Sequence, residues 1–206
     1  MAVRFYYASG SPYAWRVWLA LERKGIPYHL KTLSFDAGDL KTAEFAALNP
    51  RRRVPVLVDD DFVIYESSAV VEYIEDRWPN GPALFAAEPR KRAIERRMVR
   101  EADQYLAAIG TRYATTPSEE TARDLQQELV LWEGVATNDY LAGELSAADL
   151  TVYPFMALFV RIASRRPDFV KDDFIGPRLS AWMDRMQALP IVQHTRPPHW
   201  KQAGPA

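Results

Sequence analysis

The fold of this chain is decided by residues 51–68, which read RRRVPVLVDDDFVIYESS. Two short runs rich in β-branched residues flank an acidic turn, and a helix opens directly after the second run. Pro55 interrupts the first run, although a residue without an N–H is normally confined to a sheet edge, a strand start or an irregular peptide. The helix opens with Glu66, Ser67 and Ser68, and a helix start offers free N–H groups to an anion. The pairing predicts a site for a small anion of peptide character.

The composition is that of an ordinary globular protein. The chain has 206 residues, of which 48% are hydrophobic and 26% charged, enough for one large domain or two small ones. Its formal net charge of −1 gives no field that would recruit nucleic acid or an anionic membrane. No run of 18 apolar residues occurs, and Met1–Gly10 lacks the layout of a signal peptide. We therefore expect a cytoplasmic protein without nucleic-acid or membrane partners.

The chain contains no cysteine. Disulfides, a Cys-x-x-Cys redox pair, thiolate metal sites and a cysteine nucleophile are all excluded. The three histidines, His29, His194 and His199, are scattered and form no ligand pair at helical spacing. There is also no glycine-rich phosphate-binding loop. We therefore expect neither a metal nor a nucleotide cofactor.

The first 78 residues alternate between strand and helix patterns. Ser11-Pro12 is an N-cap followed by proline at the first helical position, and Gly25 is a helix-ending glycine. The sequence predicts the order βαβαββα: a strand at Val3–Tyr7, a helix from Pro12 to Gly25, a strand at Tyr28–Leu33, a helix at Leu40–Leu48, two strands within 51–65 and a helix that ends near Trp78.

The remainder of the chain reads as entirely helical. A cluster of helix breakers at 78–82 predicts a domain boundary, so we expect a domain at 1–78, a linker at 79–87 and a helical domain at 88–206. The expected helices begin at Glu88, at a Thr116-x-x-Glu119 capping box and at a Ser146-x-x-Asp149 capping box, the last of these covering Ala147–Ala163. A final helix is expected from Pro177 to Leu189.

Four motifs in this order make the chain resemble the cytosolic glutathione S-transferase family over nearly its whole length. The motifs are Ser11-Pro12-Tyr13 with Arg16-Val17-x-Leu19-Ala20-Leu21; Asn49-Pro50-x-x-x-Val54-Pro55-Val56-Leu57; Glu66-Ser67 with its helix; and Tyr140-Leu141-Ala142-Gly143 leading to Ser146-Ala147-Ala148-Asp149. The Ser-Pro-aromatic motif is most similar to the serine-type tau and zeta groups, of bacterial type. One departure is Arg52, which stands where the family often has glycine.

The resemblance implies a fold and an assembly. It implies an α/β thioredoxin-like N-terminal domain, an all-α C-terminal domain that contributes the electrophile site, a homodimer and a cis peptide before Pro55. It also implies that the co-substrate is glutathione and that the second substrate is a small hydrophobic electrophile.

The resemblance implies that the Ser11 hydroxyl donates a hydrogen bond to the glutathione thiolate. Making thiolate the main species at pH 7 requires the thiol pKa to fall about 2 units, or about 2.7 kcal/mol. A hydrogen bond to a charged acceptor contributes about 1.5–3 kcal/mol, and a helix N-terminus adds about 0.3–1 kcal/mol. The two effects together suffice without a metal. Tyr7 at the end of the first strand and Ser9 in the following loop are the alternative donors.

Six further residues match glutathione-binding positions of the family. By resemblance, Glu66 and Ser67 hold the γ-glutamyl end, and the backbone of Val54, fixed by Pro55, pairs with the cysteinyl unit as an added strand would. Lys41 and Arg53 match basic positions that reach the glycine carboxylate, although a solvated surface charge is the plain alternative for each.

Two classes of function remain open from the sequence. The first is an enzyme that directs the glutathione thiolate at an electrophile, a detoxifying transfer, with glutathione-dependent isomerisation and peroxide reduction as variants of the same site. The second is a protein of the same fold that binds or regulates without catalysis. Retention of Ser11, Val54-Pro55 and Glu66-Ser67 favours the enzyme.

Overall fold

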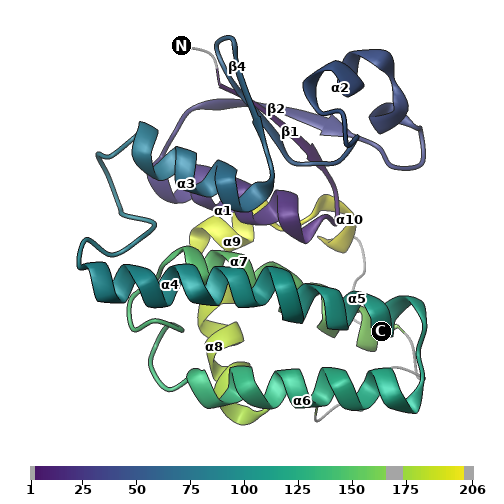
Figure 1. Ribbon diagram of the computed structural model, residues 1–206, viewed down its shortest axis with the longest axis vertical. Coiled ribbons are helices and arrows are strands. Elements are labelled where there is room, and N and C mark those ends of the chain that lie inside the picture. Colours follow the sequence, from purple (N-terminus) through teal and green to yellow (C-terminus); the bar gives the residue numbers. More distant parts are fainter. Residues whose placement is uncertain (1–2, 166–173, 202–206) are drawn as a thin grey trace. The chain divides into compact units, whose positions relative to one another are not determined.

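The computed structural model describes residues 3–165 and 174–201. Its contacts divide the chain into two units, and Figure 1 labels the elements of both. One unit combines the chain up to Leu84 with the segment from Pro190 onward, and the other is Phe85–Leu189. Within the described residues, no helix has both the length and the apolar character needed to cross a membrane.

The first unit is built on a four-stranded mixed sheet with the order β2-β1-β3-β4. The central strand β1 pairs parallel with β2 and antiparallel with β3, which forms a hairpin with β4. The predicted βαβαββα order of an α/β thioredoxin-like domain is confirmed. The elements are β1 (Val3–Ala8), α1 (Pro12–Lys24), β2 (Tyr28–Leu33), α2 (Ala43–Leu48), β3 (Val56–Asp59), β4 (Phe62–Tyr65) and α3 (Ser67–Arg77).

Successive side chains of β1 point to opposite faces of the sheet. Phe5 and Tyr7 are buried, and both rings contact Trp18 of α1. Tyr6 points the other way, and its ring lies 6.1 Å from that of Phe45 in α2. Figure 1 shows α1 and α3 running side by side below the sheet, which is the arrangement that buries the face carrying Tyr7.

The helix predicted at Leu40–Leu48 is wrong in its first turn. A short 3₁₀ segment, η1 (Asp39–Lys41), comes first, and α2 begins only at Ala43. Thr42 separates them with an extended backbone (φ −64°, ψ 151°), and its hydroxyl accepts a hydrogen bond from the Phe45 N–H at 3.2 Å. Threonine acts here as an N-cap, and an N-cap residue does not adopt helical dihedrals.

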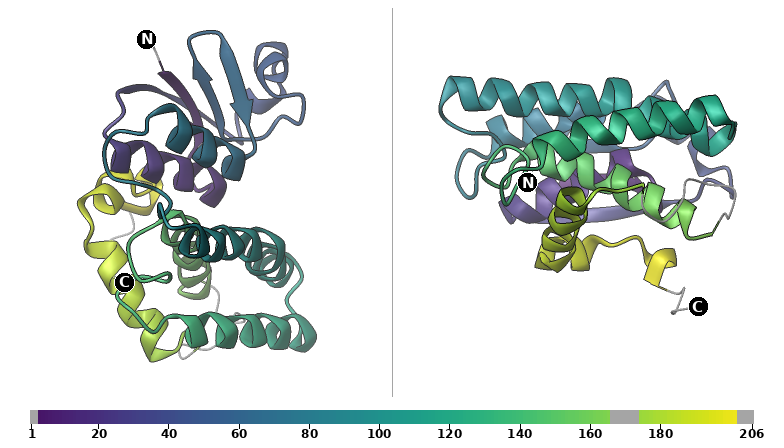
Figure 2. Two further views of the ribbon diagram at one scale, coloured as in Figure 1. Left: turned by 60° about the vertical axis from the view of Figure 1, so that its left-hand side comes forward. Right: turned by 90° about the horizontal axis from the view of Figure 1, so that it is seen from below.

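Two short helices near the end of the chain return to the first unit. They are α9 (Pro190–Thr195) and α10 (Pro198–Lys201), and Figure 2 shows α9 in yellow beside α1 in purple. The indole of Trp15 in α1 donates to Thr195 Oγ1 at 2.8 Å, and its ring meets that of Trp200 edge to face at 5.4 Å. The helix predicted from Pro177 to Leu189 is confirmed as α8 (Pro177–Ala188, with Leu189 as its C-cap), but the prediction that it is the last helix is wrong, because tertiary contacts with α1 stabilise segments too short to stand alone.

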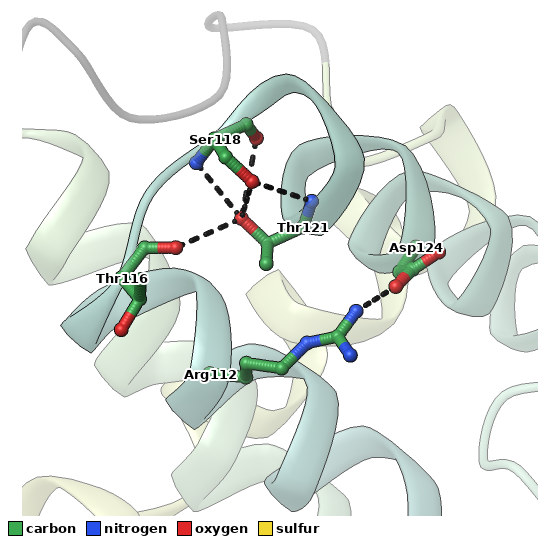
Figure 3. Close-up of polar contacts among 5 residues, drawn as sticks. All are labelled: Arg112, Thr116, Ser118, Thr121 and Asp124. Atoms are coloured by element: carbon green, nitrogen blue, oxygen red, sulfur yellow. Dashed lines mark hydrogen bonds and ion pairs between the residues drawn. The ribbon is translucent and has the colours of Figure 1, made fainter.

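The second unit is all-helical, as predicted. A π-helical segment, η2, lies inside the long helix expected from Glu88, and nothing in the sequence pattern marked it. An ion pair between Arg112 and Asp124 joins α5 to α6 (Figure 3). The elements are α4 (Pro89–Glu101), η2 (Ala102–Leu106), α5 (Ala107–Thr115), α6 (Glu119–Val135), α7 (Ala147–Ala163) and α8 (Pro177–Ala188).

The start of α6 differs from its prediction. Ser118, not Thr116, is the N-cap: its Oγ accepts from the Thr121 N–H at 3.2 Å, and its own N–H donates to Thr121 Oγ1 at 2.9 Å (Figure 3). Thr121 therefore takes the reciprocal role that the Thr-x-x-Glu pattern assigned to Glu119. Thr116 instead ends α5, and its carbonyl accepts from the Thr121 hydroxyl.

The capping box predicted at the start of α7 is confirmed, as are the bounds of that helix. Asp149 is buried and accepts hydrogen bonds from the N–H groups of Ser146 (3.0 Å) and Leu141 (2.9 Å) and from the indole of Trp182 (2.9 Å). Burial raises the pKa of Asp149, and these donated bonds oppose that rise. One carboxylate thus joins the helix start, the preceding turn and α8.

Candidate functional site

The sheet register gathers the candidate segments at one end of the first unit. Tyr6 of β1 pairs with Val56 of β3, and Val56 pairs with Tyr65 of β4. The loop after β1, the peptide before β3 and the start of α3 therefore leave the sheet at the same end. Because β2 runs parallel to β1, the segment that follows Leu33 and leads to Lys41 starts there too.

Ser11 lies at the N-cap of α1. Its backbone is extended (φ −76°, ψ 114°), and its Oγ accepts from the Ala14 N–H at 3.2 Å. The loop is closed by a bond from the Ser11 N–H to the Ala8 carbonyl at 3.2 Å. A hydroxyl that accepts one hydrogen bond keeps its proton for a second partner, so the capping role leaves Ser11 able to donate.

Tyr7 is set more deeply than Ser11. Its side chain is 1% exposed, and its ring packs against Trp18 with centroids 4.8 Å apart. Among the described residues no hydrogen-bond partner of good geometry meets its hydroxyl, although the Ser9 side chain and the Gly10 backbone lie close enough to lower its pKa. Burial outweighs them and raises the pKa of Tyr7 above the ordinary phenol value. The phenol therefore stays protonated at neutral pH.

Ser9 has a partner that the sequence did not indicate. Its Oγ lies 2.6 Å from Nδ1 of His199 in α10. The two residues are 190 positions apart, so no local pattern could join them. Ser9 is half-buried and His199 exposed, which leaves this contact at the surface of the loop that leads to Ser11.

The peptide between Val54 and Pro55 is cis, as the resemblance implied. Both residues are buried immediately before β3. The preceding loop is held by Asn49, whose side chain donates to the Arg53 carbonyl at 2.7 Å and accepts from the Arg51 N–H at 3.0 Å. Asn49 is 2% exposed, and its place in the Asn-Pro motif alone did not reveal this role.

Arg52 adopts a conformation typical of glycine. Its φ is 54°, in the left-handed region, and its N–H donates to the Asn49 carbonyl at 2.8 Å. The resemblance led us to expect glycine at this position, and the turn before Val54 has the positive φ that glycine adopts without strain. An arginine can adopt it at a cost of about 1–2 kcal/mol.

Glu66 and Ser67 form the start of α3. Glu66 occupies the N-cap position with an unusual backbone (φ 68°, ψ 104°), and within the described residues no side chain caps this helix. The Glu66 carboxylate is exposed and lies 3.7 Å from Arg51, whereas Ser67 is buried. A non-glycine residue with such dihedrals is strained, and strained residues concentrate at functional sites.

The two basic candidates lie on the surface. Lys41 is the last residue of η1, and Arg53 directly precedes Val54. Both side chains are exposed. No contact distinguishes either of them from an ordinary surface cation in the described part of the chain. Across residues 3–165 and 174–201, no three histidine, aspartate or glutamate side chains cluster as metal ligands.

Comparisons with known proteins give the family of this chain. The family model described as glutathione S-transferase, N-terminal domain, matches residues 10–77. Glutathione S-transferase 1 of Triticum aestivum is 30% identical over 202 residues, covering 86% of both chains. Maleylacetoacetate isomerase of Pseudomonas aeruginosa is 40% identical over 99 residues, covering 47% of this chain and 45% of that one. The crystal structure of a glutathione S-transferase from the Antarctic clam Laternula elliptica superposes with a TM-score of 0.86 at 28% identity, over 98% of this chain and 95% of the other. The chain belongs to the glutathione S-transferase family.

Proposed function

We propose that this protein is a glutathione transferase in which Ser11 donates a hydrogen bond to the glutathione sulfur. The bond holds the sulfur as a thiolate, which attacks an electrophilic carbon of a small hydrophobic substrate. Stabilised thiolate and correct positioning supply the rate enhancement, and no covalent intermediate with the enzyme forms. The reaction needs no metal and no nucleotide.

The observation that carries this proposal is the register of the sheet. It gathers the Ser11 cap, the cis Val54–Pro55 peptide and the start of α3 at one end of four strands. A tripeptide in extended form can use the Val54 backbone as a strand partner, with Glu66 and Ser67 at its γ-glutamyl end. Lys41 and Arg53 are the cations that we assign to its glycine carboxylate.

Burial favours Ser11 over Tyr7 as the sulfur's partner. The Tyr7 side chain is 1% exposed, its hydroxyl is enclosed and its ring packs against Trp18, whereas Ser11 keeps 9% of its surface exposed and its Oγ caps α1. The α1 N-terminus also places its positive end beside Ser11, and that potential favours a negative sulfur. Ser9 Oγ already has a hydrogen-bond partner in His199, so we assign Ser9 a supporting role and not that of hydrogen-bond donor to the sulfur.

The finer assignments follow from the same reasoning. We assign the chain to a serine-type group, near the tau and zeta groups, and expect a homodimer whose size gel filtration can check. Isomerisation remains the second candidate, because the isomerase of Pseudomonas aeruginosa shares 40% identity over the 99 residues matched. The cytoplasm is the proposed location, since a reducing compartment keeps the glutathione thiol available.

The test is the pKa of the enzyme-bound thiol, measured by ultraviolet absorbance of the thiolate. Ser11→Gly removes the hydroxyl, and glycine is a tolerable N-cap that costs only a few tenths of a kcal/mol of stability. We expect the bound thiol pKa to rise by about 1–2 units in this variant. Turnover of a chloronitroaromatic substrate at pH 6.5 should fall about tenfold or more.

Tyr7→Phe is the matched control, and it should leave the bound thiol pKa unchanged. If the bound thiol pKa rose in Tyr7→Phe and did not change in Ser11→Gly, Tyr7 rather than Ser11 would be the donor. Absence of calorimetric binding of reduced glutathione to the wild type would refute the transferase altogether. Binding without turnover of chloronitroaromatic, hydroperoxide or maleyl substrates would instead favour the non-catalytic alternative.

A further inference from the structure

The segment after α9 brings His199 onto the loop between β1 and α1. Its Nδ1 lies 2.6 Å from Ser9 Oγ. Gly10, with a φ of 92°, comes so close that a Cβ there would lie 3.1 Å from His199 Cε1. The imidazole therefore meets two consecutive residues of the loop that ends at Ser11.

Buried contacts fix the course of this segment. Trp200 is 5% exposed, and its ring meets that of Trp15 edge to face at 5.4 Å. Trp15 in turn donates to Thr195 Oγ1 at 2.8 Å, and the Trp200 N–H donates to the Pro197 carbonyl at 2.8 Å. His199 is exposed between these anchors, so its contact with Ser9 does not follow from burial of its own ring.

We infer that His199 is a positioning residue of the thiolate site: by bonding Ser9 it holds the Ser9–Ser11 loop in the shape that aims the Ser11 hydroxyl at the sulfur. This inference rests on the proposed function. One proton lies between Nδ1 and Ser9 Oγ in either tautomer of the imidazole, so the bond forms whichever atom donates. His199 acts through the loop and does not touch the sulfur.

Ser11 is held by α1, since its Oγ and its carbonyl accept from the N–H groups of Ala14 and Trp15, so the part of the loop that a contact from outside can steady is Ser9–Gly10. Gly10 has no side chain to restrict it, and the backbone bond from Ser11 to Ala8 is 3.2 Å long. A hydrogen bond to a reacting atom loses most of its value when its donor is displaced by about 1 Å. Fixing Ser9 from outside the loop restricts the movement that would displace Ser11.

The test uses four variants of the full chain: His199→Ala, His199→Asn, Ser9→Ala and the double alanine variant. His199→Ala should raise the bound thiol pKa by about half a unit to one unit and lower kcat/KM at pH 6.5 about three- to tenfold. The glutathione Kd should stay within about twofold, because the bond orients the sulfur partner rather than holding the tripeptide. His199→Asn should restore both values, since asparagine places a polar atom near the Nδ1 position.

The double variant separates positioning from general packing. If His199 acts through Ser9, the double alanine variant should be no worse than Ser9→Ala alone. An unchanged thiol pKa in His199→Ala, or additive losses in the double variant, would overturn the inference. So would a fall in Tm with no restoration by asparagine. Should His199→Ala not fold, Ser9→Ala and His199→Asn provide the test. The bound thiol pKa should rise in Ser9→Ala and stay near the wild-type value in His199→Asn.

Failure of this inference and failure of the proposed function look different. A wild-type protein that forms no bound thiolate overturns the function before any variant is made. A wild type with a thiolate that His199→Ala leaves untouched overturns only the role of His199.

Discussion

The helices α3 and α7 begin in opposite ways. At α7 the protein satisfies its own helix start, since Ser146 Oγ accepts from the Ala148 N–H at 3.3 Å and Asp149 accepts from three further donors. At α3 the N-cap is Glu66 with a φ of 68°, and within the described residues its helix start has no side-chain cap. Both starts carry a buried serine, Ser146 and Ser67.

Under the proposed function, the difference separates a structural helix start at α7 from a ligand-binding one at α3. A capped start has already bonded part of its free N–H groups to its own side chains, and its residues contribute to stability. An uncapped start keeps donors for a partner from outside and carries strain that lowers stability. Substitutions at α7 should therefore change folding, and those at α3 should change glutathione binding.

The largest effect is expected from Asp149→Ala. The change leaves the buried donors of Leu141, Ser146 and Trp182 without their acceptor, so the free energy of unfolding should fall by about 3–5 kcal/mol. Chemical denaturation measures it. Glutathione affinity of the folded variant should stay within about twofold of wild type. A loss of stability below about 1 kcal/mol would show that the hydrogen bonds to the Asp149 carboxylate contribute little to the folded state.

The second effect is expected from Ser67→Ala, with Ser146→Ala as its matched control. Ser67→Ala should weaken glutathione binding about tenfold by calorimetry and leave Tm nearly unchanged. Ser146→Ala should do the reverse, with a loss of about 1 kcal/mol of stability and no change in affinity. Equal losses of stability in the two variants would erase the distinction between these helix starts.

The third effect is expected from Glu66→Gly. Glycine accepts a positive φ without strain, so the variant should gain up to about 1 kcal/mol of stability after its own entropy cost. The same change removes a charged partner and should lower glutathione affinity about tenfold or more. Thermal melts with and without glutathione measure both quantities. A variant that loses stability would show that the Glu66 backbone is not strained.

The smallest effect is expected from Arg52→Gly. Like Glu66, Arg52 has a positive φ, and glycine would remove its backbone strain. Stability should rise by about 0.5 kcal/mol, and glutathione affinity should stay within about twofold. Arg51→Gly is the control, because Arg51 is not among the positive-φ residues and glycine there should lower stability. Denaturant melts of the two variants give the comparison.

Local signals in the sequence predicted much of this molecule. The Ser146-x-x-Asp149 spacing fixed the start of α7, and Ser11-Pro12 with Gly25 fixed both ends of α1, where Gly25 has a φ of 65°. These signals work because the groups that bond each other lie within four residues. The site residues were named by resemblance, and the roles given to them stay predictions, as do the domain bounds at 1–78 and 88–206.

The features that sequence missed depend on distant or ambiguous partners. Ser9 bonds His199 at a separation of 190 residues, and α9 gains its stability from Trp15 of α1. Thr116 and Ser118 are both good N-caps two positions apart, and only the end of α5 at Thr115 decides between them. The left-handed φ of Arg52 was hidden because the usual signal for it is glycine.

The return of α9 to α1 has a consequence for how this protein is made. Trp15 leaves the ribosome about 180 residues before Thr195, so the nascent first unit cannot close its indole bond until Thr195 has also emerged. During that interval the face of α1 that receives α9 is open to water and to chaperones. The sheet can assemble early, but the loop before Ser11 makes its contact with His199 only after that residue has also been synthesised.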